Sequence, residues 1–264
     1  MGVKTKIDWC DSSWNPVTGC LHGCEYCYAR RIAKRFSCEG QTLDAPPELQ
    51  RVWLMDGGAD LRQKGCHVLR YPVRLLNGRK CPYPFGFAPT LHRYKLDEPQ
   101  KWKKPRTIFV CSMADLFGEW VPDAWIEEVF DACAKAPQHR YLFLTKNPRR
   151  YTKLLTRYTS PNMWFGWSQT GPFESSMEFE VHHSVNTFVS IEPILRPIDR
   201  MNFKAEWMIV GAETGNRKGK IVPEKEWVNE IIQGCHENGT PIFMKESLRE
   251  IMGDDFRQEF PWEV

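Results

Sequence analysis

The fold is decided by a stretch that reads T-I-F-V-C at 107–111, V-P-D-A-W-I-E-E-V-F-D-A-C-A-K at 121–135 and Y-L-F-L-T at 141–145. The first and last runs are apolar throughout, which is typical of parallel strands covered on both faces. The middle segment repeats apolar residues every fourth position, at Trp125, Val129 and Cys133, and carries Pro122 near its start, as an amphipathic helix does. The stretch therefore predicts a strand–helix–strand unit.

The same pattern continues toward the C-terminus. Further apolar runs are M-W-F-G-W at 163–167, T-F-V-S-I at 187–191, W-M-I-V-G at 207–211 and P-I-F-M-K at 241–245. Helices are expected at 148–158 and 223–235, and a weaker helix or a loop at 172–184. Repeated units of this kind predict an α/β fold with a parallel sheet. With a short strand near Asn15–Gly19, the six runs predict a partial (β/α)6-type barrel; a complete barrel or an open doubly wound sheet is the alternative.

Polar residues follow nearly every apolar run. They are Ser112 and Asp115, Lys146, Ser168 and Gln169, Glu192, Glu213, and Lys245 and Glu246. In barrels and in doubly wound sheets alike, chemistry collects at the carboxyl ends of the strands. We therefore expect a site at this rim.

The chain has 264 residues, of which 42% are hydrophobic and 26% charged, and we expect a single domain over 1–264. Residues 38–104 interrupt the strand pattern with Pro, Gly and basic residues, and are interpreted as an irregular basic insertion or lid. No apolar run is long enough to span a bilayer, and the N-terminus has no signal-peptide stretch, so a cytoplasmic protein is expected.

The net charge of +3 is unevenly distributed. Residues 1–104 hold 18 Lys/Arg and 10 Asp/Glu, whereas residues 105–264 hold 18 and 23. A basic N-terminal part favours a polyanionic partner, although a solvated basic face is an equal alternative. The basic residues considered are Arg30, Arg31, Lys34, Arg35, Arg70, Arg74, Arg79, Lys80 and Arg93.

Three of the ten cysteines are closely spaced, in N-P-V-T-G-C-L-H-G-C-E-Y-C-Y-A-R-R-I-A-K-R-F. Cys20, Cys24 and Cys27 form C-x3-C-x2-C, followed by a helix expected to begin near Glu25. In a reducing compartment, disulfides are not expected and a close set of cysteines favours a metal. Three thiolates can bind three irons of a [4Fe-4S] cube and leave the fourth iron open for a cofactor.

This loop resembles the signature of the radical S-adenosylmethionine (SAM) superfamily, in which an aromatic residue, here Tyr26, precedes the last cysteine. The resemblance implies that Cys20, Cys24 and Cys27 hold a [4Fe-4S] cluster that binds S-adenosyl-L-methionine, and Tyr26 and Asp115 are expected among the residues that contact this cofactor.

Later motifs resemble the spore photoproduct lyase branch of that superfamily. F-V-C-S-M-A-D-L-F (109–117), L-T-K-N (144–147) and G-W-S-Q-T (166–170) imply SAM contacts from Ser112, Lys146 and Ser168. Ser112-Met113-Ala114-Asp115 stands where many radical SAM enzymes have Gly-Gly-Glu. The chain is also similar to an uncharacterised group of phage and bacterial radical-SAM-like proteins, through K-I-D-W, W-N-P-V-T-G-C, S-M-A-D-L-F, S-I-E-P and V-G-A-E-T-G.

Other residues carry open alternatives. Glu192 and Glu213 either contact SAM or substrate, or cap a loop or pair with Arg196 or Arg217. Lys245 is a site residue or a surface lysine. Asp8, Trp9, Trp14 and Asn15 pack around the cysteine loop or in the core. Structural zinc, with His22 or Cys10 as fourth ligand, is the main rival to the cluster, and Cys38, Cys66 and Cys81 are weighed as an auxiliary cluster.

The resulting expectation is a radical SAM enzyme that makes a 5′-deoxyadenosyl radical and abstracts hydrogen from a nucleic acid base or nucleotide. One specific hypothesis is rearrangement of a hypermodified thymine in phage DNA. An external electron donor such as a flavodoxin is implied. The rivals are a radical SAM enzyme that acts on a peptide or small metabolite, and a non-enzymatic zinc or cluster protein that binds nucleic acid.

Overall fold

The computed structural model describes residues 5–38, 65–155, 159–170, 185–198 and 205–263. These residues form two compact units, of which the first spans 12–141 and the second joins 5–11 to 142–264. The weaker helix considered at 172–184 lies outside the described residues. In the part of the chain that the structure describes, no helix is long and apolar enough to cross a membrane.

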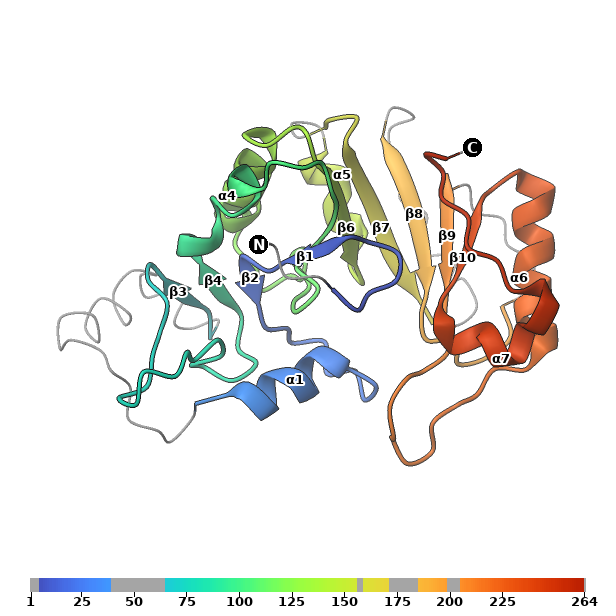
Figure 1. Ribbon diagram of the computed structural model, residues 1–264, viewed down its shortest axis with the longest axis horizontal. Coiled ribbons are helices and arrows are strands. Elements are labelled where there is room, and N and C mark those ends of the chain that lie inside the picture. The colour runs from blue at the N-terminus through green and yellow to red at the C-terminus, as the bar shows by residue number, and fades with distance from the viewer. Residues whose placement is uncertain (1–4, 39–64, 156–158, 171–184, 199–204, 264) are drawn as a thin grey trace. The chain divides into compact units, whose positions relative to one another are not determined.

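The first unit contains the cysteine loop. Its elements are β1 (Ser12–Trp14), β2 (Val17–Thr18), α1 (Tyr28–Phe36), β3 (His67–Leu69), β4 (Thr90–His92), η1 (Arg93–Lys95), η2 (Pro99–Lys101), β5 (Thr107–Val110) and α4 (Asp123–Ala134). β1 pairs with β5 in parallel. β2, β4 and β3 form a separate three-stranded sheet, in which β2 is antiparallel and β3 parallel to β4 (Figure 1).

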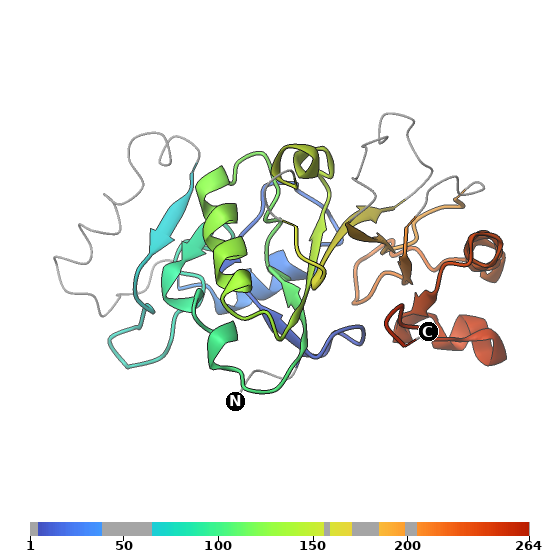
Figure 2. The same ribbon diagram turned by 90° about the horizontal axis from the view of Figure 1, so that it is seen from above.

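The second unit is a run of strands and helices. It contains β6 (Arg140–Thr145), which begins in the first unit, then α5 (Arg149–Leu154), β7 (Met163–Gln169), β8 (Asn186–Ile191), β9 (Trp207–Val210), α6 (Lys225–Asn238), β10 (Ile242–Met244), η4 (Glu246–Leu248), α7 (Arg249–Met252) and η5 (Gly253–Asp255). β7 pairs with β8, β8 with β9, and β9 with β10, all in parallel. Both ribbon views place α6 beside β9 and β10 (Figure 1 and Figure 2).

All six apolar runs form strands within two residues of the expected bounds. The strands β5, β9 and β10 are buried along their whole length, as apolar residues on both faces require. Val228 and Ile231 of α6 pack against Val210 and Met244, and so cover one face of the sheet. The mixed α/β class with parallel strands is confirmed.

Among the described residues, the larger of the two sheets has seven strands. Their order in the sheet is β1-β5-β6-β7-β8-β9-β10. A doubly wound sheet reverses its strand order at a switch point. This order contains no reversal, which removes the open doubly wound alternative.

The expectation of little regular structure between 38 and 104 is wrong for the C-terminal part of that segment. β3, β4 and two short 3-10 helices lie there. The strands form because the backbone of 67–69 finds a partner in 90–92, which in turn pairs with 17–18. Residues 39–64 lie outside the described residues.

The tryptophans near the N-terminus are core residues. Trp9 packs against Phe188 and Trp207 in the second unit. Trp14 packs near Tyr141 in the first unit, and its indole N–H donates to the carbonyl of Lys95. Burial of the large rings explains both positions.

Candidate functional site

The three clustered cysteines lie on the loop between β2 and α1. All three remain thiols and are partly exposed. The helix begins at Tyr28, three residues later than expected, because Cys27 is its N-cap and its Sγ accepts from the backbone N–H of Arg30 at 3.4 Å. A turn closed by the N–H of Cys27 and the carbonyl of Cys24 precedes it. The second and third cysteines are therefore fixed to the start of α1.

The first cysteine is fixed by backbone contacts on both sides. The N–H of Gly19 donates to the carbonyl of Met113 at 2.9 Å, and the N–H of Cys20 donates to the carbonyl of Phe87 at 3.2 Å. Gly19 has φ +88°, and a Cβ there would lie 2.2 Å from the carbonyl oxygen of Ala88. Only glycine satisfies both the left-handed backbone and this close approach. The loop thus enters between the segment after β5 and residues 87–89.

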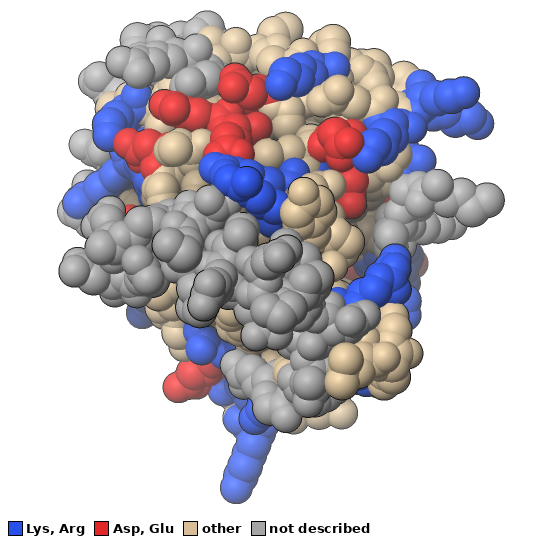
Figure 3. All heavy atoms as spheres, turned by 90° about the vertical axis from the view of Figure 1, so that its left-hand side faces the viewer, with Lys and Arg blue, Asp and Glu red and all other residues tan. Residues whose placement is uncertain are grey.

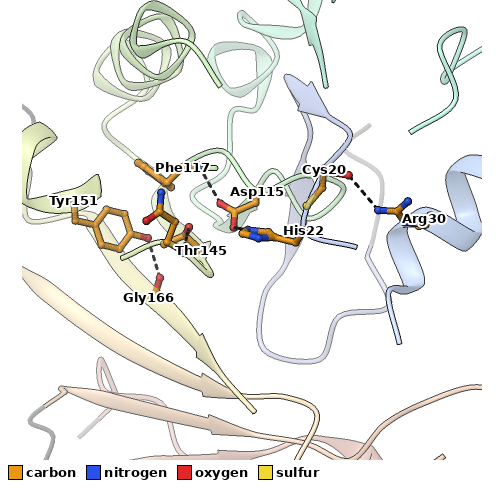
Figure 4. Close-up of polar contacts among 9 residues, drawn as sticks. Cys20, His22, Arg30, Asp115, Phe117, Thr145, Tyr151 and Gly166 are labelled. Carbon is orange, nitrogen blue, oxygen red and sulfur yellow. Dashed lines mark hydrogen bonds and ion pairs between the residues drawn. The ribbon is translucent and has the colours of Figure 1, made fainter. Parts of the chain in front are cut away.

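A side-chain contact joins the loop to the segment after β5. Nε2 of His22 lies 2.7 Å from Oδ2 of Asp115, and the other carboxylate oxygen accepts from the N–H of Phe117 (Figure 4). The ring of Trp120 meets the imidazole edge-on, with centroids 4.9 Å apart. Asp115 is 5% exposed, and a carboxylate buried to this extent requires hydrogen-bond donors. Through its contact with His22, Asp115 holds the cysteine loop against the segment after β5.

The three thiols of the loop interact electrostatically with one another and with Asp115. The pKa of the Cys20 thiol is raised to about 11, chiefly by burial and also by the negative charges of Asp115, Cys27 and Cys24, although the backbone N–H of His22 acts to lower it. The coupling to both other thiols places the three sulfurs in one electrostatic environment. A metal reverses such repulsion, because its positive charge stabilises the thiolates that bind it.

The three sulfurs do not yet form a ligand set. Among the described residues, no group of three or more His, Cys, Asp or Glu side chains is arranged to hold a metal ion. The donor chemistry nevertheless fits an iron–sulfur cluster, because three partly exposed thiols share one short loop and interact electrostatically.

The serine after β5 is held by two contacts. Its Oγ donates to Oδ1 of Asn15 at 3.2 Å, and its carbonyl accepts from the hydroxyl of Tyr28 at 2.7 Å. Cys111, directly before Ser112, has φ +59°, a left-handed conformation that side chains other than glycine rarely adopt. Strained backbone of this kind is concentrated at functional sites. Tyr26, predicted to contact SAM, is half-buried.

In the second unit, three strand ends bring predicted residues together. Glu192 follows β8 and Lys245 follows β10, and the two form an ion pair. Gly211, after β9, leaves room for the lysine stem, since a Cβ there would lie 3.0 Å from Cδ of Lys245. Glu192 therefore pairs with Lys245 rather than with Arg196 or Arg217. Lys146 and Ser168 also lie in this unit, and both are partly buried.

The carboxylate of Glu213 forms an ion pair with a neighbouring arginine. Both carboxylate oxygens accept from the Arg217 guanidinium at 2.7 Å, and the glutamate side chain is 2% exposed. These hydrogen bonds hold the pKa of Glu213 below its ordinary value. Of the alternatives considered from the sequence for Glu213, the structure contains the pairing with Arg217.

A family model matches residues 4–249, and its description is "Protein of unknown function (DUF5131)". The match covers more than nine-tenths of the chain and includes every candidate site residue named above. The chain belongs to the DUF5131 family. No curated protein and no solved structure matches it.

In this DUF5131 chain, the proposed auxiliary cluster is contradicted. Cys38 and Cys81 form a disulfide, with Cα atoms 6.0 Å apart, so they are not available together as ligands. The expectation that disulfides are absent is wrong for this pair, because pairing of Ser37 with Tyr83 brings the two cysteines together. Cys66 lies elsewhere, with its thiol donating to the carbonyl of Trp120.

The zinc alternative loses one of its candidate ligands to another contact. Nε2 of His22 is already hydrogen-bonded to Asp115. Cys10 belongs to the second unit, and its thiol is directed at the carbonyl of Ile7. Among the described residues, no group that could hold a metal ion includes either residue, and the zinc alternative stays a hypothesis.

On one face of the structure, the described basic residues are interspersed with acidic ones. On the face shown in Figure 3, Lys and Arg side chains lie among Asp and Glu side chains in the described part. Arg93 pairs with Glu128, and Arg74 donates to the carbonyl of Gly78. By contrast, the basic residues of α1 share a helix that has no acidic residue.

Proposed function

We propose that this chain is a radical SAM enzyme with a partial barrel, in which Cys20, Cys24 and Cys27 hold a [4Fe-4S] cluster. The observation that carries the proposal is the loop itself: three thiols in C-x3-C-x2-C spacing, fixed at Gly19 and at the start of α1. Three ligands leave one iron open for a cofactor. The one-way strand order supports a barrel.

Bound together, the cluster and SAM supply reductive cleavage of a carbon–sulfur bond and a 5′-deoxyadenosyl radical. In our proposal the chain's own residues orient SAM. Lys146 pairs with its carboxylate, and the hydroxyls of Ser112 and Ser168 bond its amino group and ribose. The partly exposed Glu192 is available for a SAM hydroxyl or a cationic group of the substrate.

Two of the expected SAM contacts have a positioning role in this proposal. Asp115 holds the cysteine loop through His22, and Glu213 holds its own segment through Arg217. Tyr26 contacts the cofactor from its position next to Cys27. Asn15, considered from the sequence as a residue that packs around the cysteine loop, and Tyr28, which was not considered, hold Ser112 in place.

The proposed substrate is a nucleic acid base or nucleotide, and the proposed setting is the cytoplasm with a flavodoxin-type electron donor. The basic N-terminal part of the chain supports a polyanionic substrate. Rearrangement of a hypermodified thymine in phage DNA is a specific form of this proposal. If it is correct, the enzyme with reductant and SAM changes the mass profile of nucleosides recovered from such DNA; an unchanged profile counts against it.

Anaerobic reconstitution tests the cofactor chemistry. The expected product is a brown protein that contains iron and sulfide and releases 5′-deoxyadenosine from SAM. Cys24→Ala is expected to lose both properties, whereas Cys10→Ala, which removes another half-buried cysteine, keeps them. A colourless protein that binds zinc, or unchanged 5′-deoxyadenosine production by Cys24→Ala, overturns the proposal.

A further inference from the structure

Helix α1 exposes a row of large apolar side chains. Tyr28, Ile32 and Phe36 are 43%, 37% and 51% exposed, while the helix buries only Ala29 and Ala33. Residues four apart lie one above another on a helix, so the three form a single row about 12 Å long. An apolar row left in solvent on a short helix indicates a surface that is used for binding.

A basic row runs beside the apolar row. At 3.6 residues per turn, Arg35 and Arg31 come next around the helix after Tyr28, on the side away from the buried alanines. The guanidinium of Arg35 lies 5.5 Å from the ring centroid of Phe36. With Arg30 and Lys34 the helix carries four positive charges and no negative charge.

The two rows begin at the cysteine loop. Cys27 is the N-cap of α1, and the hydroxyl of Tyr28 bonds the carbonyl of Ser112, which fixes the first ring of the row. On the loop itself, Leu21 is 52% exposed. A polymer bound along α1 therefore has one end next to the three thiols.

We propose that this face of α1 binds single-stranded nucleic acid, with bases stacked on Tyr28 and Phe36 and phosphates along Arg31 and Arg35. Proteins that bind single strands combine a basic track with exposed aromatic rings in this way. In a duplex the base faces are covered, and enzymes that act on a base take it out of the stack. The inference rests on the proposed function, from which it takes nucleic acid as the substrate. It deepens that function by naming the surface that binds the strand.

An acidic protein is the other occupant that the charge would attract. Such a partner needs the positive charges but gains little from planar rings, whereas stacking requires a ring at position 36. Replacing Phe36 with Leu keeps an apolar side chain and removes the ring; replacing it with Trp keeps a ring. Since Phe36 is half exposed, neither change disturbs the core.

Fluorescence anisotropy with a labelled DNA of about 15 nucleotides tests the inference on anaerobically reconstituted protein without reductant. The single strand is expected to bind more tightly than the same sequence as a duplex. Phe36→Leu should weaken single-strand binding about 5- to 100-fold, and Phe36→Trp should retain it. No binding, equal binding of the duplex, or an unchanged affinity of Phe36→Leu overturns the inference.

Salt dependence tests the phosphate track. Arg31→Gln combined with Arg35→Gln should reduce the slope of log affinity against log salt concentration by roughly 1.4, since each single-strand phosphate contact contributes about 0.7. Lys103→Gln with Lys104→Gln removes the same charge from exposed residues of the same unit and should leave the slope unchanged. Equal effects of the two double variants overturn the assignment to α1.

SAM cleavage, measured on the same protein preparations after a reductant is added, separates this inference from the proposed function. If the wild-type protein produces 5′-deoxyadenosine but does not bind the DNA, the docking surface alone is overturned. Intact DNA binding by a protein without iron overturns the radical chemistry alone and leaves the docking surface supported.

Discussion

Nε2 of His22 lies 2.7 Å from Oδ2 of Asp115, a carboxylate 93 positions further along the chain. The histidine sits between the first two cysteines of the loop, and the carboxylate follows β5. The contact therefore joins the cysteine loop to the end of a strand. Because Asp115 is buried, the loop and the strand end depend on one another for this hydrogen bond.

A double-mutant cycle should detect that dependence. His22→Ala leaves a buried carboxylate without one of its donors, and we expect it to lower the free energy of unfolding by about 1–3 kcal/mol. Asp115→Asn keeps the contact to Phe117 and removes the charge. Combined, the two changes should show an interaction energy of about 0.5–3 kcal/mol in urea unfolding.

The exposed pair of Arg93 and Glu128 in the same unit is the control. Its side chains are 39% and 30% exposed, so Arg93→Ala should cost at most about 1 kcal/mol. If the effects of His22→Ala and Asp115→Asn simply add, the two residues do not act together.

Two glycines of the loop provide a matched test of its geometry. Gly19 and Gly23 have φ +88° and +74°, but only a Cβ at position 19 meets other atoms. Gly23→Ala should cost about 1–2 kcal/mol from the left-handed backbone alone. Gly19→Ala adds a clash with the backbone of Ala88 and should cost about 2–5 kcal/mol.

The iron content of the same two variants provides a second test. In the proposed function, displacement of residues 87–89 by Gly19→Ala moves Cys20 and reduces cluster loading, whereas Gly23→Ala retains it. Equal destabilisation by the two variants would show that the close approach to Ala88 does not constrain the loop.

The strands were predictable because their signal is local. The runs of β5 to β10 are apolar throughout, and burial on both faces leaves little other choice. The beginning of α1 was less predictable, since its N-cap is a cysteine side chain rather than one of the usual capping residues. The context of the cysteine motif therefore placed the start of the helix three residues too early.

The contacts that arrange the site were not predictable from spacing. The pairing of His22 with Asp115 and the disulfide of Cys38 with Cys81 join residues far apart in the chain. The same holds for β3 and β4, whose composition resembles that of a loop. Motif spacing identified the cysteines and the polar strand ends, but not which of the latter pair with each other.

The disulfide gives a prediction that is independent of the cofactor. It closes a 43-residue separation, for which loop entropy predicts roughly 4 kcal/mol of stabilisation. Cys81→Ser should therefore lower the free energy of unfolding by about 2–4 kcal/mol in oxidising buffer, and by much less once both proteins are reduced.

The number of reactive thiols, titrated in denaturant, tests whether the disulfide is present. Oxidised protein without a cluster should show eight reactive thiols before reduction and ten after it. Ten thiols before reduction would contradict the disulfide.

The pair of Glu213 and Arg217 predicts how stability depends on pH. Because the guanidinium lowers the pKa of Glu213 in the folded protein, the glutamate's contribution is fully present above its ordinary value of 4.5. It is lost as the pH falls through the lower, folded-state pKa. Wild-type protein should therefore lose more unfolding free energy between pH 5 and pH 3 than Glu213→Gln, which cannot titrate. At pH 7, Arg217→Met should cost about 1–3 kcal/mol, because it leaves a buried carboxylate without its main donor. Parallel pH curves for wild type and Glu213→Gln in urea unfolding would show that the carboxylate is not held by Arg217.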